Sequence, residues 1–239
     1  MDRRLHLSIV IPVHNEEKII EGRILNLIKQ LKNTKYHFQI LIVENGSTDK
    51  TLSVCKKISA IPNIKILSLK NANYGKALRT GMLESRGKMI INFDLDYYDV
   101  NFAYQAMALE PFGYDIIIAS KNLRSSLDKR SLVRKLISST YKYLLYYGFG
   151  LKVSDTHGIK AWRNDDKLHK LILSTINNNE IFDTELIIRS QYAGRTLLEL
   201  PTIVEEMRKP VTSILIRSIR GFYQISKLWL TLKVKERWL

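Results

Sequence analysis

The sequence predicts an α/β fold built on a doubly wound, mostly parallel sheet with helices on both faces. Short runs rich in Ile and Val alternate with longer stretches whose apolar residues recur at helical spacing. The short runs are apolar almost throughout, as expected of strands that are covered on both faces. Because helical stretches separate these runs, we expect consecutive strands to lie parallel in one sheet.

Five strands and three helices are expected in the first half of the chain. The expected strands are residues 7–12, 38–43, 64–69, 89–93 and 114–119. The expected helices are residues 16–31, 49–58 and 76–85. Open sheets of this kind bind ligands outside the carboxyl ends of their strands, so the residues that follow each strand are the candidates for chemistry.

The composition is that of a packed globular protein of 239 residues. Apolar residues make up 45% of the chain and charged residues 26%, which argues against a disordered polymer. The single cysteine, Cys55, cannot form an internal disulfide, so the cytoplasmic side is favoured. No apolar run approaches the roughly 20 residues that span a bilayer, and we therefore expect any membrane attachment to be peripheral.

The net charge of +15 is concentrated in two segments of the sequence. Residues 121–152 and 207–239 carry +7 each, whereas residues 1–120 carry +4 and residues 153–206 carry −3. An excess of this size indicates a phosphate-bearing partner, such as nucleic acid, anionic lipid or a phosphorylated substrate. We interpret the two segments as one functional surface. The alternative is that they are the solvated faces of two helices.

Polar clusters follow three of the predicted strands. They are residues 12–16, residues 44–49, and the pair Asp94 and Asp96. Two carboxylates placed together in a cleft repel each other, and a divalent cation that bridges them to a diphosphate relieves that repulsion. Oxygen ligands favour Mg²⁺ or Mn²⁺. The alternative is an ordinary solvated strand end.

In their order and spacing, these motifs resemble those of family 2 glycosyltransferases with the GT-A fold. The likeness covers roughly residues 5–215. The segments that carry it are residues 8–17, 42–51, 73–81, 93–96, 155–163, 182–186 and 199–201. Within the family, the run from Lys129 to Leu136 followed by Asp155 and Thr156 is most similar to enzymes that transfer a sugar to dolichyl or another polyprenyl phosphate.

The resemblance implies a nucleotide-sugar donor bound at the strand ends. The residues implied at the nucleotide and its sugar are Pro12, His14, Asn15, Glu16, Glu44, Asn45, Lys76 and Asp94. Of these, Glu44 and Asn45 are implied at the base or ribose, and Lys76, near a helix start, at the diphosphate. A UDP-sugar is favoured over GDP-mannose, because the likeness is closer to dolichyl-phosphate glucosyltransferases than to mannosyltransferases.

The resemblance also implies a metal and two catalytic residues. Asp94 and Asp96 match a DxD motif, which holds Mg²⁺ or Mn²⁺ and the donor diphosphate. Tyr98 occupies a position where some relatives have a glutamine ligand, so water or donor oxygens are expected to complete the metal shell. Asp155 matches an aspartate near the reacting sugar, and Asp96 and Asp155 are the expected catalytic residues.

A lipid phosphate is the acceptor that the resemblance implies. The residues implied at its phosphate are Lys121, Arg130, Arg134 and Ser138, with Arg124 as a neighbour. Such a phosphate is already anionic near neutral pH and needs little or no general base, so the site has to bind and aim it. Similar enzymes invert the anomeric carbon, which implies a β-linked product. Roles for His157 and Arg208 stay open.

The last segment of the chain is expected to be a separate element. Residues 1–210 would form the catalytic domain, and residues 211–239 a basic amphipathic helix with Leu215, Ile219 and Phe222 among its apolar residues. Such a helix can lie in a membrane interface with its cations near anionic head groups. The alternatives are packing on the protein's own core or on a second copy of the chain in a homo-oligomer.

The sequence is compatible with two other functions. A soluble or polysaccharide acceptor would need a general base, for which Asp155 and Asp183 are available. A nucleic-acid-binding module would account for the charge through phosphate contacts. The acidic motifs at the strand ends and the absence of a nucleic-acid signature argue against that module, so no nucleic-acid partner is expected.

Overall fold

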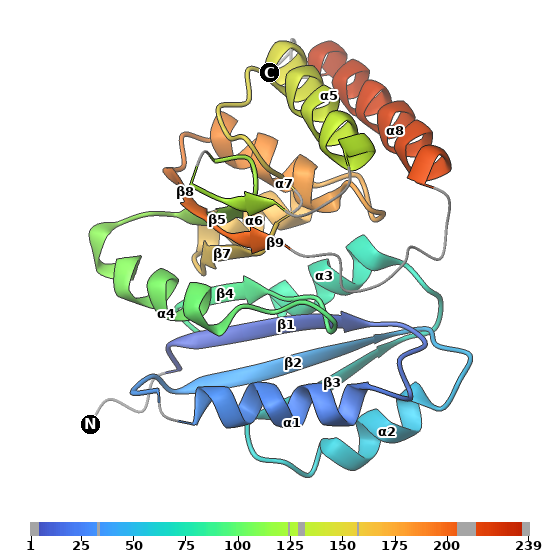
Figure 1. Cartoon of the computed structure of the whole chain (residues 1–239), viewed down its shortest axis with the longest axis vertical. Helices are drawn as coiled ribbons and strands as arrows, with labels where there is room; N and C mark the ends of the chain where they lie inside the picture. Colours follow the sequence, from blue (N-terminus) through green and yellow to red (C-terminus); the bar gives the residue numbers. More distant parts are fainter. Residues whose placement is uncertain are drawn as a thin grey trace.

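The fold is a twisted central sheet with helices on both faces (Figure 1). The computed structural model describes residues 5–32, 34–123, 125–128, 132–156, 158–204 and 214–235. Within these residues, seven strands form one sheet in the order β3-β2-β1-β4-β7-β5-β8. The strands are β1 (Leu7–Val13), β2 (Phe38–Asn45), β3 (Ile64–Leu69), β4 (Met89–Asn92), β5 (Ile116–Ser120), β7 (Lys160–Arg163) and β8 (Leu197–Pro201).

All five strands predicted from the sequence are confirmed, and the sheet is mostly parallel as expected. β1 pairs in parallel with β2 and β4, β2 with β3, and β5 with β8. β7 is the exception, because it runs antiparallel between β4 and β5. β7 and β8 were not predicted. A second, two-stranded sheet pairs β6 (Leu127–Asp128) with β9 (Ile203–Val204).

Helices cover the two faces of the sheet. The α-helices are α1 (Ile20–Leu31), α2 (Thr51–Ile58), α3 (Tyr74–Leu83), α4 (Val100–Leu109), α5 (Leu132–Phe149), α6 (Asp166–Ser174), α7 (Phe182–Tyr192) and α8 (Ile214–Lys235), and α4 continues into the 3₁₀ helix η1 (Glu110–Phe112). The three helices expected in the first half are confirmed as α1, α2 and α3.

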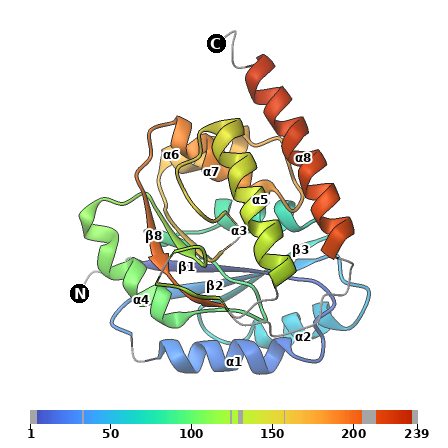
Figure 2. The same cartoon turned by 45° about the horizontal axis from the view of Figure 1, so that its top comes forward.

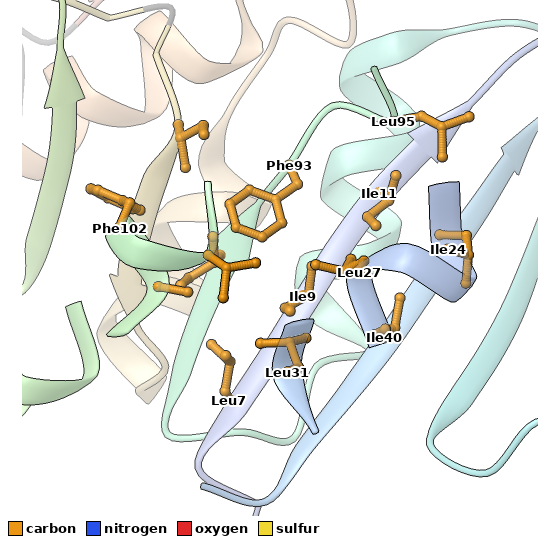
Figure 3. Close-up of a cluster of buried hydrophobic side chains, with 14 of the residues drawn as sticks. Leu7, Ile9, Ile11, Ile24, Leu27, Leu31, Ile40, Phe93, Leu95 and Phe102 are labelled. Atoms are coloured by element: carbon orange, nitrogen blue, oxygen red, sulfur yellow. The ribbon is translucent and has the colours of Figure 1, made fainter. Parts of the chain in front are cut away.

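Side chains that alternate along the strands supply two separate cores. On one face, Ile9 and Ile11 of β1 lie against Ile24 and Leu27 of α1, as Figure 3 shows. On the other face, Val10 of β1 belongs to a second core with residues of α3, α6 and α7. Successive side chains of a strand point to opposite faces, so an apolar run without alternation is what a doubly covered sheet requires.

The C-terminal helix α8 packs beside α5, and the two views agree on this arrangement (Figures 1 and 2). Ile225, Leu228 and Leu232 are buried in the same core as Leu145 and Phe149 of α5. In its described part, the apolar side of α8 therefore packs on the protein itself. No helix within the described residues combines the length and apolar character required to cross a membrane.

Candidate active site

The loops that follow β1 and β2 are joined by side-chain to backbone hydrogen bonds. His14 Nδ1 lies 2.9 Å from the carbonyl oxygen of Asn45. Asn15 Oδ1 accepts a 2.8 Å hydrogen bond from the backbone N–H of Thr48. The backbone N–H of Glu16 donates to Thr51 Oγ1 at 2.8 Å. The structure thus brings the residues that follow β1, implied at the nucleotide, next to the second polar cluster.

Glu44 and Asn45 are buried at the end of β2 and support the surrounding loops. Glu44 accepts hydrogen bonds from the backbone N–H of Ser47 at 2.6 Å and from Ser68 Oγ at 2.7 Å. Asn45 Oδ1 accepts from the backbone N–H of Asn73 at 2.6 Å. These bonds join the end of β2 to its own turn, to β3 and to the segment before α3, and contact with a base or ribose stays a prediction.

Gly46 allows this turn to form. Its φ of +62° lies in the left-handed region, and a Cβ atom there would stand 2.6 Å from the backbone of Asn71 and Ala72. The close approach brings the end of β2 against the segment that leads into α3. Asn73 then caps α3, because its side chain accepts from the backbone N–H of Lys76 at 3.1 Å. The side chain of Lys76 is exposed at this helix start.

Asp94 and Asp96 follow β4 and lie close enough for their charges to interact. Burial among protein atoms, together with the negative charges of Asp96 and Asp183, raises the pKa of Asp94 to about 6, although part of its surface is open to a cavity. A cation bound nearby would stabilise the ionised form of a carboxyl group in such a place.

The donor set fits a divalent metal that shares its ligands with a diphosphate. Among the described residues, no three His, Cys, Asp or Glu side chains are grouped to hold a metal by themselves. Mg²⁺ in nucleotide sites commonly takes one or two carboxylates and fills its shell with phosphate oxygens and water. Asp94 and Asp96 match that arrangement.

Tyr98, at the position where some relatives have a glutamine, is held by α1. Its hydroxyl accepts a 2.8 Å hydrogen bond from Asn26 Nδ2, and its ring lies 4.8 Å from the guanidinium of Arg23. Arg23 also donates to the backbone carbonyls of Leu95 and Asp96. The loop that carries the two carboxylates is therefore attached to α1.

A cavity of about 140 Å³ lies at the carboxyl edge of the sheet. It is lined by Tyr74, Asn92, Asp94, Tyr97, Ala119, Lys121, Asp155, Gly158, Ile159, Asp183 and Thr202. Three residues that the resemblance implied at the site, Asp94, Lys121 and Asp155, meet here although they are far apart in the chain. Asp183, named as an available general base for a soluble acceptor, lines the same cavity. Their convergence supports the assignment of this edge of the sheet as the site.

Lys121 and Asp155 form an ion pair in the cavity wall. Lys121 Nζ lies 2.6 and 2.8 Å from the two carboxylate oxygens of Asp155. Asp155 is 5% exposed, and Glu199 Oε1 accepts hydrogen bonds from the backbone N–H groups of Ser154 and Asp155. The prediction placed Lys121 at the acceptor and Asp155 at the sugar, and the structure places the two side chains in contact.

Several functional candidates were not predicted. Asn92 and Tyr74 line the cavity, and Lys160 is 1% exposed beside it. Lys160 Nζ donates to Asp183 Oδ2 at 2.6 Å and to the carbonyl oxygen of Gly158 at 2.8 Å. The available signal was that both Lys160 and Asp183 lie in segments that carry the family resemblance.

The remaining residues implied at the acceptor phosphate are only partly described. Ser138 is half-buried on α5. Arg134 lies on the same helix, but its side chain is not among those that the structure describes. Arg124, Arg130, His157 and Arg208 lie outside the described residues.

A scan against protein families identifies the chain. The model described as glycosyl transferase family 2 matches residues 8–172, which include the strand ends and the cavity residues from Asn92 to Ile159. The chain belongs to glycosyl transferase family 2. The resemblance inferred from the motifs is confirmed, and the protein is a glycosyltransferase of this family.

Curated relatives share about a third of their aligned residues with this chain. An uncharacterized protein of Methanocaldococcus jannaschii is 31% identical over 205 residues, which are 82% of this chain and 79% of that protein. The dolichyl-phosphate beta-glucosyltransferases of Homo sapiens and Dictyostelium discoideum are 30% and 31% identical and cover 60% and 82% of this chain. The chain spans 47% and 65% of the length of these two enzymes.

Solved structures confirm the GT-A type of fold. Mannosyl-3-phosphoglycerate synthase from Rubrobacter xylanophilus has a TM-score of 0.71 at 18% identity and covers 98% of this chain and 75% of its own. Glucosyl-3-phosphoglycerate synthase from Mycobacterium tuberculosis, in complex with Mn²⁺, UDP and glucosyl-3-phosphoglycerate, has a TM-score of 0.65 at 17% identity. It covers 91% of this chain and 77% of its own.

Proposed function

We propose that this family 2 glycosyltransferase transfers a hexose from a nucleoside diphosphate sugar to a polyprenyl phosphate and inverts the anomeric carbon. The observation that carries the proposal is the cavity in which Asp94 of the DxD pair and the Lys121–Asp155 ion pair meet. It brings a carboxylate that could bind a metal and a cation that could face a second phosphate into one site. The similarity to dolichyl-phosphate beta-glucosyltransferases supports the lipid acceptor.

On the donor side, Asp94 and Asp96 would hold Mg²⁺ or Mn²⁺ together with the diphosphate. The bound metal would supply charge neutralisation for the diphosphate as it leaves. Lys76, exposed at the start of α3, would meet the same phosphates from the helix side. The structural neighbour with Mn²⁺ and UDP supports both the metal and a uridine nucleotide.

On the acceptor side, a phosphate oxygen would attack the anomeric carbon while the bond from that carbon to the donor diphosphate breaks. The attacking oxygen is already ionised near neutral pH, so the step releases no proton that a base must accept. The task of the protein is to hold two anions in line, and Lys121 in the cavity wall provides positive charge for the acceptor. Asp155 orients the Lys121 ammonium.

A membrane surface would present such an acceptor, and one face of α5 suits it. Leu132, Leu136, Tyr143 and Tyr147 are spaced along one side of the helix and are all more than half exposed. Residues 121–152, which include α5, carry +7. An apolar stripe within a basic segment matches the interface of an anionic bilayer. We propose peripheral attachment through this face, on the cytoplasmic side.

The test is turnover with defined acceptors. Purified protein is given UDP-glucose or GDP-mannose, Mg²⁺ or Mn²⁺, and either a short polyprenyl phosphate or soluble sugars. We expect a β-linked polyprenyl phosphate sugar that disappears in excess chelator and in Asp96→Ala. Transfer to soluble sugars with none to the lipid phosphate would refute the acceptor, and full activity in chelator would refute the metal.

A further inference from the structure

The side chain of Glu185, in the first turn of α7, is completely buried and holds the α6–α7 connection, residues 175–181. Its Oε1 accepts from the backbone N–H of Ile176 at 2.9 Å and from Arg189 Nε at 2.8 Å. Its Oε2 accepts from the backbone N–H of Asn177 at 2.9 Å and from Asn177 Nδ2 at 2.7 Å. Burying a charged carboxylate is costly unless it is paired and hydrogen-bonded. These four bonds therefore tie the connection firmly to α7.

Arg79 attaches the same connection to α3. Its Nη2 donates to the backbone carbonyl of Thr175 at 2.6 Å and also to the hydroxyl of Thr175. Its guanidinium lies 5.7 Å from the ring centroid of Phe182, where α7 begins. Burial lowers the pKa of Arg79, and the negative charge of Glu185 opposes that shift, so the two charges lie within electrostatic reach of each other. One side chain from α7 and one from α3 thus hold the connection.

The connection packs against the first turn of α3. The backbone carbonyl of Asn178 accepts from the backbone N–H of Lys76 at 3.0 Å. A Cβ atom on Gly75 would stand 2.5–2.6 Å from backbone atoms of Asn178 and Asn179, so the close approach requires a glycine. The same N–H of Lys76 also donates to the cap residue Asn73. Since the protein already satisfies this N–H, a diphosphate would meet Lys76 through its side chain.

The two helices that the connection joins flank the cavity. Tyr74, where α3 begins, and Asp183, in the first turn of α7, both line it. Glu185 is not among the described residues that line the cavity. A carboxylate that lies outside the cavity lining and has four donors of its own does not act on a substrate directly. What it sets is the position of the start of α3 relative to the start of α7.

We propose that Glu185 is a positioning residue for the nucleotide-sugar donor, because it fixes the connection against which the first turn of α3, with Lys76, is packed. This inference rests on the proposed function, which places Lys76 at the donor diphosphate. It goes beyond that function by assigning the support of Lys76 to a residue of α7. Lys121 is held by Asp155 and not by this connection, so donor binding should suffer without Glu185 and acceptor binding should not.

The test measures the affinity for UDP by calorimetry in the presence of Mn²⁺, in two variants that release the connection in different ways. Glu185→Gln turns an amide NH₂ towards groups that themselves donate, and Gly75→Ala forces Asn178 away from α3 while Glu185 stays intact. Each variant should bind UDP about threefold to tenfold more weakly. The double variant should lose less than the product of the two single losses, because both changes break one support.

Gly22→Ala is the matched control for Gly75→Ala. A Cβ atom on Gly22, in α1, would meet nothing within 4 Å, so this variant should bind UDP like the natural protein. Asn177→Ala removes a single donor to Glu185 and should show a smaller loss of UDP affinity than Glu185→Gln. It carries the test together with Gly75→Ala if Glu185→Gln does not fold.

Two further measurements separate positioning from a general loss of structure. The KM for UDP-glucose should rise in Glu185→Gln and Gly75→Ala, while the KM for polyprenyl phosphate stays within about twofold of the natural value. In a Lys76→Met background, Glu185→Gln should cost less UDP affinity than it does in the natural protein, because the side chain that it positions is already gone.

Three outcomes would overturn the inference while the natural protein still binds UDP and transfers the sugar. One is UDP affinity that is unchanged in folded Gly75→Ala and Asn177→Ala. Another is an equal rise in both KM values, which would assign Glu185 a general structural role. The third is a loss from Glu185→Gln that is as large in Lys76→Met as in the natural protein. If the natural protein binds neither UDP nor GDP, the proposed donor fails, and the positioning role fails with it.

Discussion

The guanidinium of Arg23, on α1, donates a hydrogen bond to the backbone carbonyl of Asp96. It also donates to the carbonyl of Leu95 at 3.0 Å and lies over the ring of Tyr98. One side chain thus contacts three residues of the loop that carries Asp94 and Asp96, the carboxylates proposed to bind the metal. A group that fixes the backbone around a ligand residue acts on metal binding without touching the metal.

We therefore expect Arg23→Met to weaken the dependence on Mn²⁺. The concentration of Mn²⁺ that gives half-maximal turnover should rise about tenfold, while the chain stays folded by circular dichroism. Arg86→Met is the control, because Arg86 is exposed and precedes β4 at its other end. An Arg23→Met variant with the metal response of the natural protein would show that the loop holds its geometry unaided.

Replacing Lys121 should separate the acceptor from the donor. In Lys121→Met the KM for polyprenyl phosphate is expected to rise about tenfold, with the KM for UDP-glucose within about twofold of the natural value. Lys65→Met is a matched control, since Lys65 forms a 2.6 Å ion pair with Glu84 outside the cavity. The KM values come from initial rates with one substrate varied at a time.

Because Lys121→Met leaves the buried Asp155 without its cation, Lys121→Arg serves as a second variant that keeps the charge. It should fold and show a smaller rise in the acceptor KM. Arg134→Ala is expected to act in the same direction as Lys121→Met. Equal changes in both KM values, or no change in either, would refute the acceptor role of Lys121.

Membrane binding should depend on the exposed face of α5. Replacing Tyr143 and Tyr147 together with Ser should weaken binding to vesicles that contain phosphatidylglycerol about tenfold, because two aromatic rings no longer enter the interface. The control replaces Phe112, which is 75% exposed in η1, with Ser. Sedimentation with vesicles at low and high salt measures the binding of both variants. Vesicle binding that is unchanged when the two Tyr residues are replaced, or that Phe112→Ser weakens as much, would exclude this face.

Asp165 links stability to pH at a site far from these substrates. Burial alone would raise its pKa, but hydrogen bonds from Arg195 and from the backbone N–H of Leu168 hold the pKa of Asp165 below its usual value. A lowered pKa stabilises the fold above about pH 3.8, and that contribution is lost as the pH falls through the lower folded value. Asp165→Asn should therefore cost about 1–2 kcal/mol at pH 7.

The measurement is the melting temperature of both proteins across pH. At pH 7 the Asp165→Asn variant should melt roughly 3–6 °C lower. Towards pH 3 the difference should shrink, because the natural side chain becomes protonated as well. A difference that stays constant from pH 7 to pH 3 would mean that the carboxylate charge has no part in the effect.

The first half of the fold was predictable because its strands are uniform apolar runs. β1 to β5 lie where Ile and Val cluster, and the polar residues after β1, β2 and β4 indicated the edge that carries the cavity. β7 could not be recognised in the same way. It has four residues, two of them basic, and Lys160 is buried only because α7 brings Asp183 against it. Because the counter-ion of Lys160 comes from a distant segment, the residues of β7 show no pattern of alternating apolar side chains that would reveal a strand.

Site residues that belong to a single sequence motif could be predicted. Residues whose place in the site depends on the packing of several elements could not. Asp94 stood out because two carboxylates follow an apolar run, and Asp155 was implied by the family resemblance; both line the cavity. Asn92 reads as the last residue of a strand, and nothing nearby indicates that its amide lacks a donor. For α8, the apolar stripe predicted a helix but could not say what covers it. In the described part Ile225 and Leu228 are covered by the protein's own core.

The reversed direction of β7 determines which of its residues lies beside the cavity. Since β7 is antiparallel to its neighbours, its first residue, not its last, arrives at the edge where the other strands end. Side chains alternate along a strand, so a slip of one residue would replace Lys160 with Ala161 and turn the lysine into the opposite core. The register of a four-residue strand therefore decides whether Asp183 has a counter-ion, and insertions between residues 155 and 160 should be tolerated poorly.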